Sequence, residues 1–170
     1  PVFRAEGRGL TDGLSRAAAR AIAALQARTD RVPIPEPDDL EGWDQLFERQ
    51  EAAVAPANAR ALEKYSPGLG AEHPGGMPAL VVTPTTLSGA RARIVYLHGG
   101  AYTLFSARST LFATVPLAHD LGLELWSLDY PRAPRTQYDQ TVPRVTEALV
   151  AACADGVPVI LVGDSAGGGL

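Results

Sequence analysis

The serine of Gly163–Gly167, which reads Gly-Asp-Ser-Ala-Gly, has the setting of a nucleophile. This segment follows the apolar run Val157–Val162, which predicts a strand, and precedes small residues that suit the start of a helix. In a nucleophile elbow, two glycines let strand and helix approach closely while the serine takes a strained turn that exposes its oxygen. We therefore interpret Ser165 as the nucleophile. The residues expected to support its turn are Gly163, Asp164 and Gly167.

An ordinary glycine-rich turn, such as a phosphate-binding loop, is the alternative interpretation of this segment. No Gly-Lys-Ser/Thr follows it, and G-x-G-x-x-G does not fit the stretch. The position after a strand and before a helix favours the elbow.

A second motif, His98–Tyr102, reads His-Gly-Gly-Ala-Tyr and directly follows a predicted strand that ends at Leu97. Acyl transfer develops an oxyanion, and backbone N–H groups must already point at it. Glycines expose such donors because no side chain stands in the way. One donor is expected from this loop and another from Ala166, the residue after the nucleophile. His98 precedes the serine, so we interpret it as a structural histidine that holds the loop by hydrogen bonds.

The elements that must position these motifs follow an alternating pattern after Tyr65. Strands are predicted at Ala79–Thr83, Ala92–Leu97, Leu123–Leu128 and Val157–Val162, and helices at Ser109–Leu121 and Val142–Ala154. We expect the first two strands to form a hairpin through Ser88–Gly89, and the apolar last strand to be buried on both faces. The alternation predicts an α/β fold with a mostly parallel sheet.

Residues 1–65 have a helical composition and are predicted as a separate helical region. A first helix is expected to start at Thr11 or Asp12, with an apolar stripe of Leu14, Ala18, Ile22 and Leu25. Pro33, Pro35 and Pro37 predict a stiff connector. A second helix should start at Asp38 or Asp39, with an apolar face of Trp43, Leu46, Phe47 and Val54. Pro56 is expected to interrupt it before a further helical stretch to Leu62.

Composition excludes several classes of partner. The net charge of −4 and the isoelectric point near 5.3 argue against nucleic-acid binding. No apolar run approaches the roughly 18 residues of a membrane span, and the first residues contain no signal-peptide core. Cys153 is the single cysteine, so no internal disulfide can form. A cytoplasmic protein is the resulting expectation.

Three segments in order resemble the hormone-sensitive-lipase-like family of α/β-hydrolases. His98–Tyr102 resembles its HGGG motif, Asp129–Pro134 its DYRLAP-like segment, and Gly163–Gly168 its GDSAGG motif. The resemblance runs from about Ile94 to Leu170. It implies a hydrolase sheet with an N-terminal hairpin over residues 66–170, and an N-terminal helical cap over residues 1–65.

By this resemblance, Ser165 is the nucleophile of a serine carboxylesterase or lipase-like enzyme. The oxyanion hole would be surrounded by Gly99, Gly100, Ala101 and Ala166. The implied substrates are small to medium acyl esters or lactones, and no metal or other cofactor is expected. Ala101 replaces the family's third glycine, and Pro131, Arg132 and Arg135 also depart from its pattern. These departures affect the expected substrate class more than the reaction type.

In this family the triad acid and base follow the serine. His73, His98 and His119 all precede it. We therefore expect the acid, the base and the final strands of the sheet outside this chain, in a C-terminal segment of the same protein that acts as its partner. Oligomerisation is left open.

Two other functions stay open on sequence grounds. The same fold can serve as a non-catalytic, receptor-like ligand-binding protein, and the same triad can serve an acyltransferase or an amidase. Fold alone does not separate these functions.

Overall fold

The computed structural model describes residues 13–26, 33–89 and 92–170 of two compact units, Pro1–Ile34 and Pro35–Leu170. In the first unit, α1 spans Arg16–Gln26. The side chain of Ser15 caps it, because its Oγ accepts a hydrogen bond from the N–H of Ala18 at 3.2 Å. The predicted starting residues, Thr11 and Asp12, lie outside the described residues.

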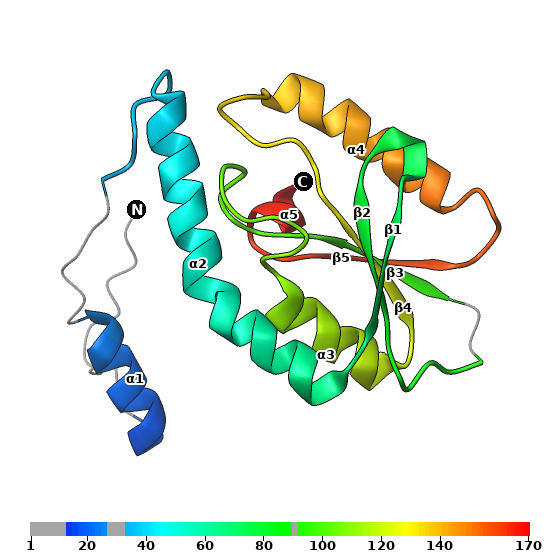
Figure 1. Cartoon of the computed structure of the whole chain (residues 1–170), viewed down its shortest axis with the longest axis horizontal. Coiled ribbons are helices and arrows are strands. Elements are labelled where there is room, and N and C mark those ends of the chain that lie inside the picture. Colours follow the sequence, from blue (N-terminus) through cyan, green and yellow to red (C-terminus); the bar gives the residue numbers. More distant parts are fainter. Residues whose placement is uncertain (1–12, 27–32, 90–91) are drawn as a thin grey trace. The chain divides into compact units, whose positions relative to one another are not determined.

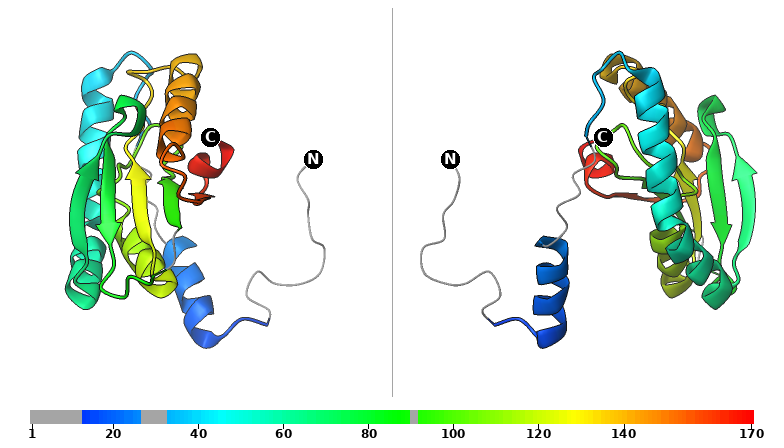
Figure 2. Two further views of the ribbon diagram at one scale, coloured as in Figure 1. Left: turned by 90° about the vertical axis from the view of Figure 1, so that its right-hand side faces the viewer. Right: turned by 60° about the vertical axis from the view of Figure 1, so that its left-hand side comes forward.

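The second unit contains one five-stranded sheet whose strands lie in the order β1-β2-β4-β3-β5. The strands are β1 (Gly68–Glu72), β2 (Ala79–Thr83), β3 (Arg93–Leu97), β4 (Glu124–Leu128) and β5 (Val159–Gly163). β2 is antiparallel to β1 and β4, whereas β3 is parallel to both β4 and β5. Figure 2 shows β1, β2 and β4 side by side. The predicted α/β fold is confirmed.

The predicted hairpin between Ala79–Thr83 and Ala92–Leu97 is wrong, because β2 forms its hairpin with a different strand. β2 pairs with β1, with Leu69 opposite Val82, and it has no pairing with β3. The short 3-10 turn Pro74–Gly76 joins the two strands, and Gly75 and Gly76 both take a positive φ there. All five residues of β1 are exposed, so the strand carries no apolar pattern that sequence analysis could detect. β3 instead lies between β4 and β5.

Helices cover the two faces of the sheet (Figure 1). They are α2 (Leu40–Tyr65), α3 (Leu111–Leu121) and α4 (Tyr138–Ala152), with a short α5 (Ala166–Gly169) at the end of the chain. The alternating side chains of β3 enter different cores. Ile94 packs with α2 and α3 through residues that include Ala61 and Val115, whereas Val95 packs with α4 through residues that include Ala148.

α2 continues through Pro56, so the predicted interruption is wrong. The side chain of Asp39 caps the helix by accepting from the N–H of Gly42 at 2.9 Å, in agreement with one of its two predicted starting residues. Proline lacks the N–H that would bond the preceding turn. Pro56 is exposed, however, and Ala61 on the same helix is buried in the core, so packing holds the two halves in one helix.

β5 is an edge strand, and the expectation that both its faces are buried is wrong for the described chain. Ile160 is 44% exposed and Leu161 is 55% exposed. β3 is its one strand neighbour, and its apolar side chains are only partly covered within residues 35–170.

Candidate active site

Ser165 stands at the turn between β5 and α5 with φ +49° and ψ −116°. A positive φ is unusual for a residue with a side chain and stores strain of about 1–3 kcal/mol. Neither flanking glycine can carry a β-carbon. One on Gly163 would lie 2.5 Å from the carbonyl oxygen of Gly167, and one on Gly167 would overlap the carbonyl oxygen of Leu97. The strand and helix therefore approach as closely as an elbow requires, and the serine is exposed.

The loop after β3 is held in a compact turn by Gly100. Its carbonyl oxygen accepts hydrogen bonds from the N–H groups of Thr103 at 3.1 Å and Leu104 at 2.8 Å. Its own φ is +113°, and a β-carbon there would overlap the carbonyl oxygen of Leu104. Ala101 has φ +54° and Tyr102 has φ +63°. The alanine that stands in place of a third glycine thus takes the left-handed conformation that glycine favours.

Backbone donors remain unused in both motif segments. Within the described residues, no hydrogen bond uses the N–H groups of Gly99, Gly100, Ala101 or Ala166. Unpaired N–H groups are rare in folded proteins, and donors left without a partner can bind a negatively charged group.

His98 is fully buried and its ring holds the loop from inside. Its Nδ1 lies 2.8 Å from the carbonyl oxygen of Gly99, which requires Nδ1 to be the donor. The ring stacks on Tyr130 with centroids 4.2 Å apart, and the Tyr130 hydroxyl donates to the His98 carbonyl oxygen at 2.5 Å. Burial lowers the pKa of His98, so the imidazole is neutral near pH 7.

Asp164 forms a contact that sequence analysis did not find. The hydroxyl of Tyr96, on β3, donates to its Oδ1 at 2.8 Å. No local pattern in the sequence indicates this contact, because the two residues are 68 positions apart.

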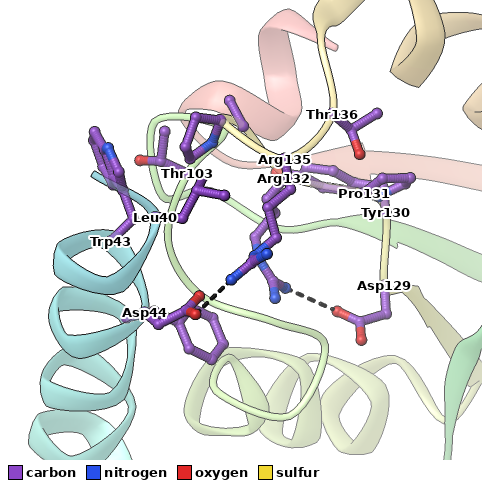
Figure 3. A pocket seen from close by; sticks show the side chains of 13 residues that line it. Leu40, Trp43, Asp44, Thr103, Asp129, Tyr130, Pro131, Arg132, Arg135 and Thr136 are labelled. Carbon is purple, nitrogen blue, oxygen red and sulfur yellow. Dashed lines mark hydrogen bonds and ion pairs between the residues drawn. The ribbon is translucent and has the colours of Figure 1, made fainter. Parts of the chain in front are cut away.

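The segment Asp129–Thr136 forms a cavity of about 400 Å³ against α2 (Figure 3). Arg132 stacks on the Phe47 ring at 4.4 Å and donates to the Phe105 carbonyl oxygen at 2.8 Å. Arg135 forms an ion pair with Asp44 of α2. Both arginines depart from the family motif, and through Phe47 and Asp44 they connect the segment Asp129–Thr136 to α2. Ser165 does not line this cavity, so we assign the cavity no part in bond breaking.

The two other histidines lie outside both motif segments. His73 is exposed just before the Pro74–Gly76 turn. His119 lies on α3, with its ring 4.8 Å from that of Tyr65. Across residues 13–26, 33–89 and 92–170 there is no group of three or more His, Cys, Asp or Glu residues that could hold a metal ion. In the same part of the chain, every helix is too short or too polar to cross a membrane.

Comparison with known proteins shows what this chain resembles. Residues 94–170 match the family described as having the alpha/beta hydrolase fold. LipR of Mycobacterium tuberculosis, provisionally named an acetyl-hydrolase, is 35% identical over 98 residues, which are 56% of this chain and 32% of LipR. An acetyl-hydrolase of Streptomyces hygroscopicus is 35% identical over 80 residues, which are 45% of this chain and 27% of that protein.

Among solved structures, a hormone-sensitive lipase from a metagenome library superposes with a TM-score of 0.71 at 26% identity. The match covers 92% of this chain and 49% of that lipase. The chain is therefore similar to hormone-sensitive-lipase-like α/β-hydrolases in sequence and in fold. These comparisons agree with the resemblance noted in the sequence. The chain spans about a third or less of the length of the curated relatives it matches and about half of the lipase structure.

Proposed function

We propose that the full-length protein is a serine esterase that hydrolyses small to medium acyl esters or lactones through an acyl-enzyme on Ser165. The observation that carries the proposal is the backbone of Ser165, with φ +49° at an exposed strand-to-helix turn between two glycines that cannot hold a β-carbon. Such strain persists only where the surrounding structure enforces it, and it concentrates at functional sites. The acetyl-hydrolase names of two relatives support a short acyl group.

In the proposed first step, the Ser165 oxygen attacks the ester carbonyl carbon while a base takes its proton. The carbonyl oxygen becomes an oxyanion, which accepts hydrogen bonds from the unused N–H groups of Ala166 and of the Gly99–Ala101 loop. The alcohol leaves with a proton returned by the base. Water then attacks the acyl-serine, and the carboxylic acid is released with Ser165 restored.

His98 is not a candidate for that base. Its ring is fully buried, Nδ1 donates to the Gly99 carbonyl oxygen, and burial lowers its pKa. The family order puts the acid and the base after the serine. Only Ala166–Leu170 follow Ser165 in this sequence, and none of these residues is Asp, Glu or His. We therefore assign neither role to a residue of this chain.

The test is to treat the full-length protein with a fluorophosphonate probe and to measure hydrolysis of p-nitrophenyl acetate, butyrate and octanoate. We expect labelling at Ser165, with both labelling and turnover abolished in Ser165→Ala. Ser15→Ala is the matched control, because Ser15 is an exposed serine of the first unit. Labelling that persists in Ser165→Ala would refute the assignment.

The same measurements separate the other functions of this fold. Binding of ester or lactone without turnover or labelling would indicate a receptor-like protein. Turnover that requires an added alcohol would indicate an acyltransferase, and preferential cleavage of p-nitroanilide amides would indicate an amidase.

A further inference from the structure

Tyr96 connects the centre of the sheet to the elbow. It is 4% exposed on β3, where it lies in the same core as Ile94. In the parallel pairing of β3 with β5, Tyr96 is opposite Val162. Asp164 is two residues beyond Val162, so the side chains of Tyr96 and Asp164 lie on the same face of the sheet. The Tyr96 hydroxyl reaches diagonally across this pair and donates to Asp164 Oδ1 at 2.8 Å.

Asp164 is held on several sides. Its second carboxylate oxygen lies against Gly99, where a β-carbon on that glycine would come within 2.6 Å of it. Its N–H donates to the Leu97 carbonyl oxygen at 3.3 Å, and its carbonyl oxygen accepts from the N–H of Gly167 at 2.8 Å. Asp164 therefore contacts the end of β3, the first turn of α5 and the start of the Gly99–Ala101 loop, which we call the oxyanion loop. It is also the residue directly before Ser165.

The hydroxyl of Tyr96 is a permanent donor. Burial raises its pKa above the ordinary value of tyrosine, and the hydrogen bond to Asp164 raises that pKa further. Tyr96 therefore stays protonated at any pH used to assay ester hydrolysis. A hydrogen bond to an ionised carboxylate is among the stronger ones in proteins.

We propose that Tyr96 is a positioning residue that holds Asp164 and, through it, aligns the strained Ser165 turn with the Gly99 end of the oxyanion loop. This inference rests on the proposed function and adds to it a residue outside the three motifs. Tyr96 touches neither substrate nor reacting atoms in this role. It acts on the distance between the nucleophile and the oxyanion donors, to which acyl transfer is sensitive.

The kinetic test compares Tyr96→Phe with the wild type of the full-length protein. Displacing reacting groups by about 1 Å costs on the order of 10²-fold in rate, so we expect kcat to fall by about 10- to 100-fold while KM changes little. Thr114→Val is the matched control. It also removes one buried hydroxyl, which donates to the carbonyl oxygen of Thr110, the residue before α3, and it should leave kcat unchanged.

A double substitution tests whether the effect passes through Asp164. Asp164→Ala removes the oxygen that accepts from Tyr96, so it should cost at least as much as Tyr96→Phe. Because each single change removes the same contact, the double variant should lose much less than the product of the two single losses. Fully independent losses would overturn the proposed route.

Hydrogen exchange gives a reading that does not depend on turnover. In Tyr96→Phe, we expect faster amide exchange in residues 97–101 and 163–170, with no such change in Thr114→Val. Unchanged exchange in both segments would overturn the inference even if kcat fell. If the wild type shows no Ser165-dependent turnover, the proposed function fails, and the exchange measurement still decides whether Tyr96 holds the turn.

Discussion

Backbone strain is concentrated in the motif residues. Within the described chain, positive φ values occur at five residues other than glycine, and four of them lie in or near the two motifs: Ala101, Tyr102, Phe105 and Ser165. The remaining one, Ser66, ends α2. Each such residue costs of order 1–3 kcal/mol, so neighbouring contacts must enforce the conformation. At the candidate site these contacts are made where backbone segments approach glycines closely.

If the Gly99–Ala101 loop serves as proposed, Gly100→Val should lower kcat in the full-length protein by about 10²–10³-fold with a smaller effect on KM, because the substitution would displace a backbone donor of the proposed oxyanion hole. A β-carbon at this position would overlap the Leu104 carbonyl oxygen. Gly156→Val is the control, since Gly156 also has a positive φ but faces open space. Steady-state kinetics checks the result, and a folded Gly100→Val variant with normal kcat would contradict the role of the loop.

The buried His98 should make stability depend on pH. Burial lowers its folded-state pKa below the unfolded value of about 6.5, so the unfolded state binds more protons as the pH falls. His98 therefore makes its full contribution to the free energy of unfolding above about pH 6.5, and this contribution is lost as the pH falls through the lower folded-state pKa. Asn can place a donor near the position of Nδ1 without titrating. In His98→Asn, the fall in melting temperature between about pH 7.5 and 5.5 should be smaller than in the wild type. An identical pH dependence would exclude His98 as its source.

At the scale of elements, strongly apolar segments could be predicted and weakly patterned ones could not. The observed bounds of α3, β4 and β5 lie within a few residues of the predicted bounds, because clear turn residues flank each element. α4 begins at Tyr138, four residues before its predicted start, because the Gln140 side chain accepts a hydrogen bond from the N–H of Gln137, the N-cap residue, at 3.4 Å. β1 was missed because its Gly-Leu-Gly-Ala-Glu sequence is exposed throughout and is held by backbone pairing alone.

The candidate site shows the same limit. Its motif residues could be proposed from the sequence because glycine, serine and histidine stand there at a fixed spacing that indicates their chemistry. The contact between Tyr96 and Asp164 could not be found, because it depends on the pairing of β3 with β5 across 68 positions of the chain. The same holds for Arg132 and Phe47, which meet only because α2 lies beside the Asp129–Thr136 segment.

Pro56→Ala should stabilise α2. It restores a backbone N–H in the interior of the helix, where proline is about 3 kcal/mol less favourable than alanine, although a native helix already adapted to proline should recover only part of this. We expect the free energy of unfolding to rise by about 1–2 kcal/mol in urea denaturation. Pro37→Ala, outside the helix, should give no gain. An equal gain from both variants would show that the helix interior is not the cause.

At the scale of the whole molecule, the second unit presents an open sheet edge at β5. Expressed as the 170 residues of this sequence, the chain should self-associate through that strand, because unpaired N–H and C=O groups beside apolar side chains attract further strands. Leu161→Lys should reduce the associated fraction in sedimentation velocity. Leu121→Lys is the control, since Leu121 is 49% exposed but lies at the end of α3. Equal effects of the two lysines would contradict association through β5.

The start of α3 has a consequence for the order of folding. Thr110, at the N-cap position, makes no side-chain capping bond. Asn58 of α2 supplies the cap instead, because its Oδ1 accepts from the N–H of Phe112 at 2.8 Å and its Nδ2 donates to the carbonyl oxygens of Arg108 and Ser109 at 3.1 Å. These bonds close loops of 50 to 54 residues. Loop closure of this length costs chain entropy before any contact is gained, so non-local contacts form slowly. The first turn of α3 can therefore be completed only after α2 has docked, and the two helices are expected to form and to melt as one cooperative unit.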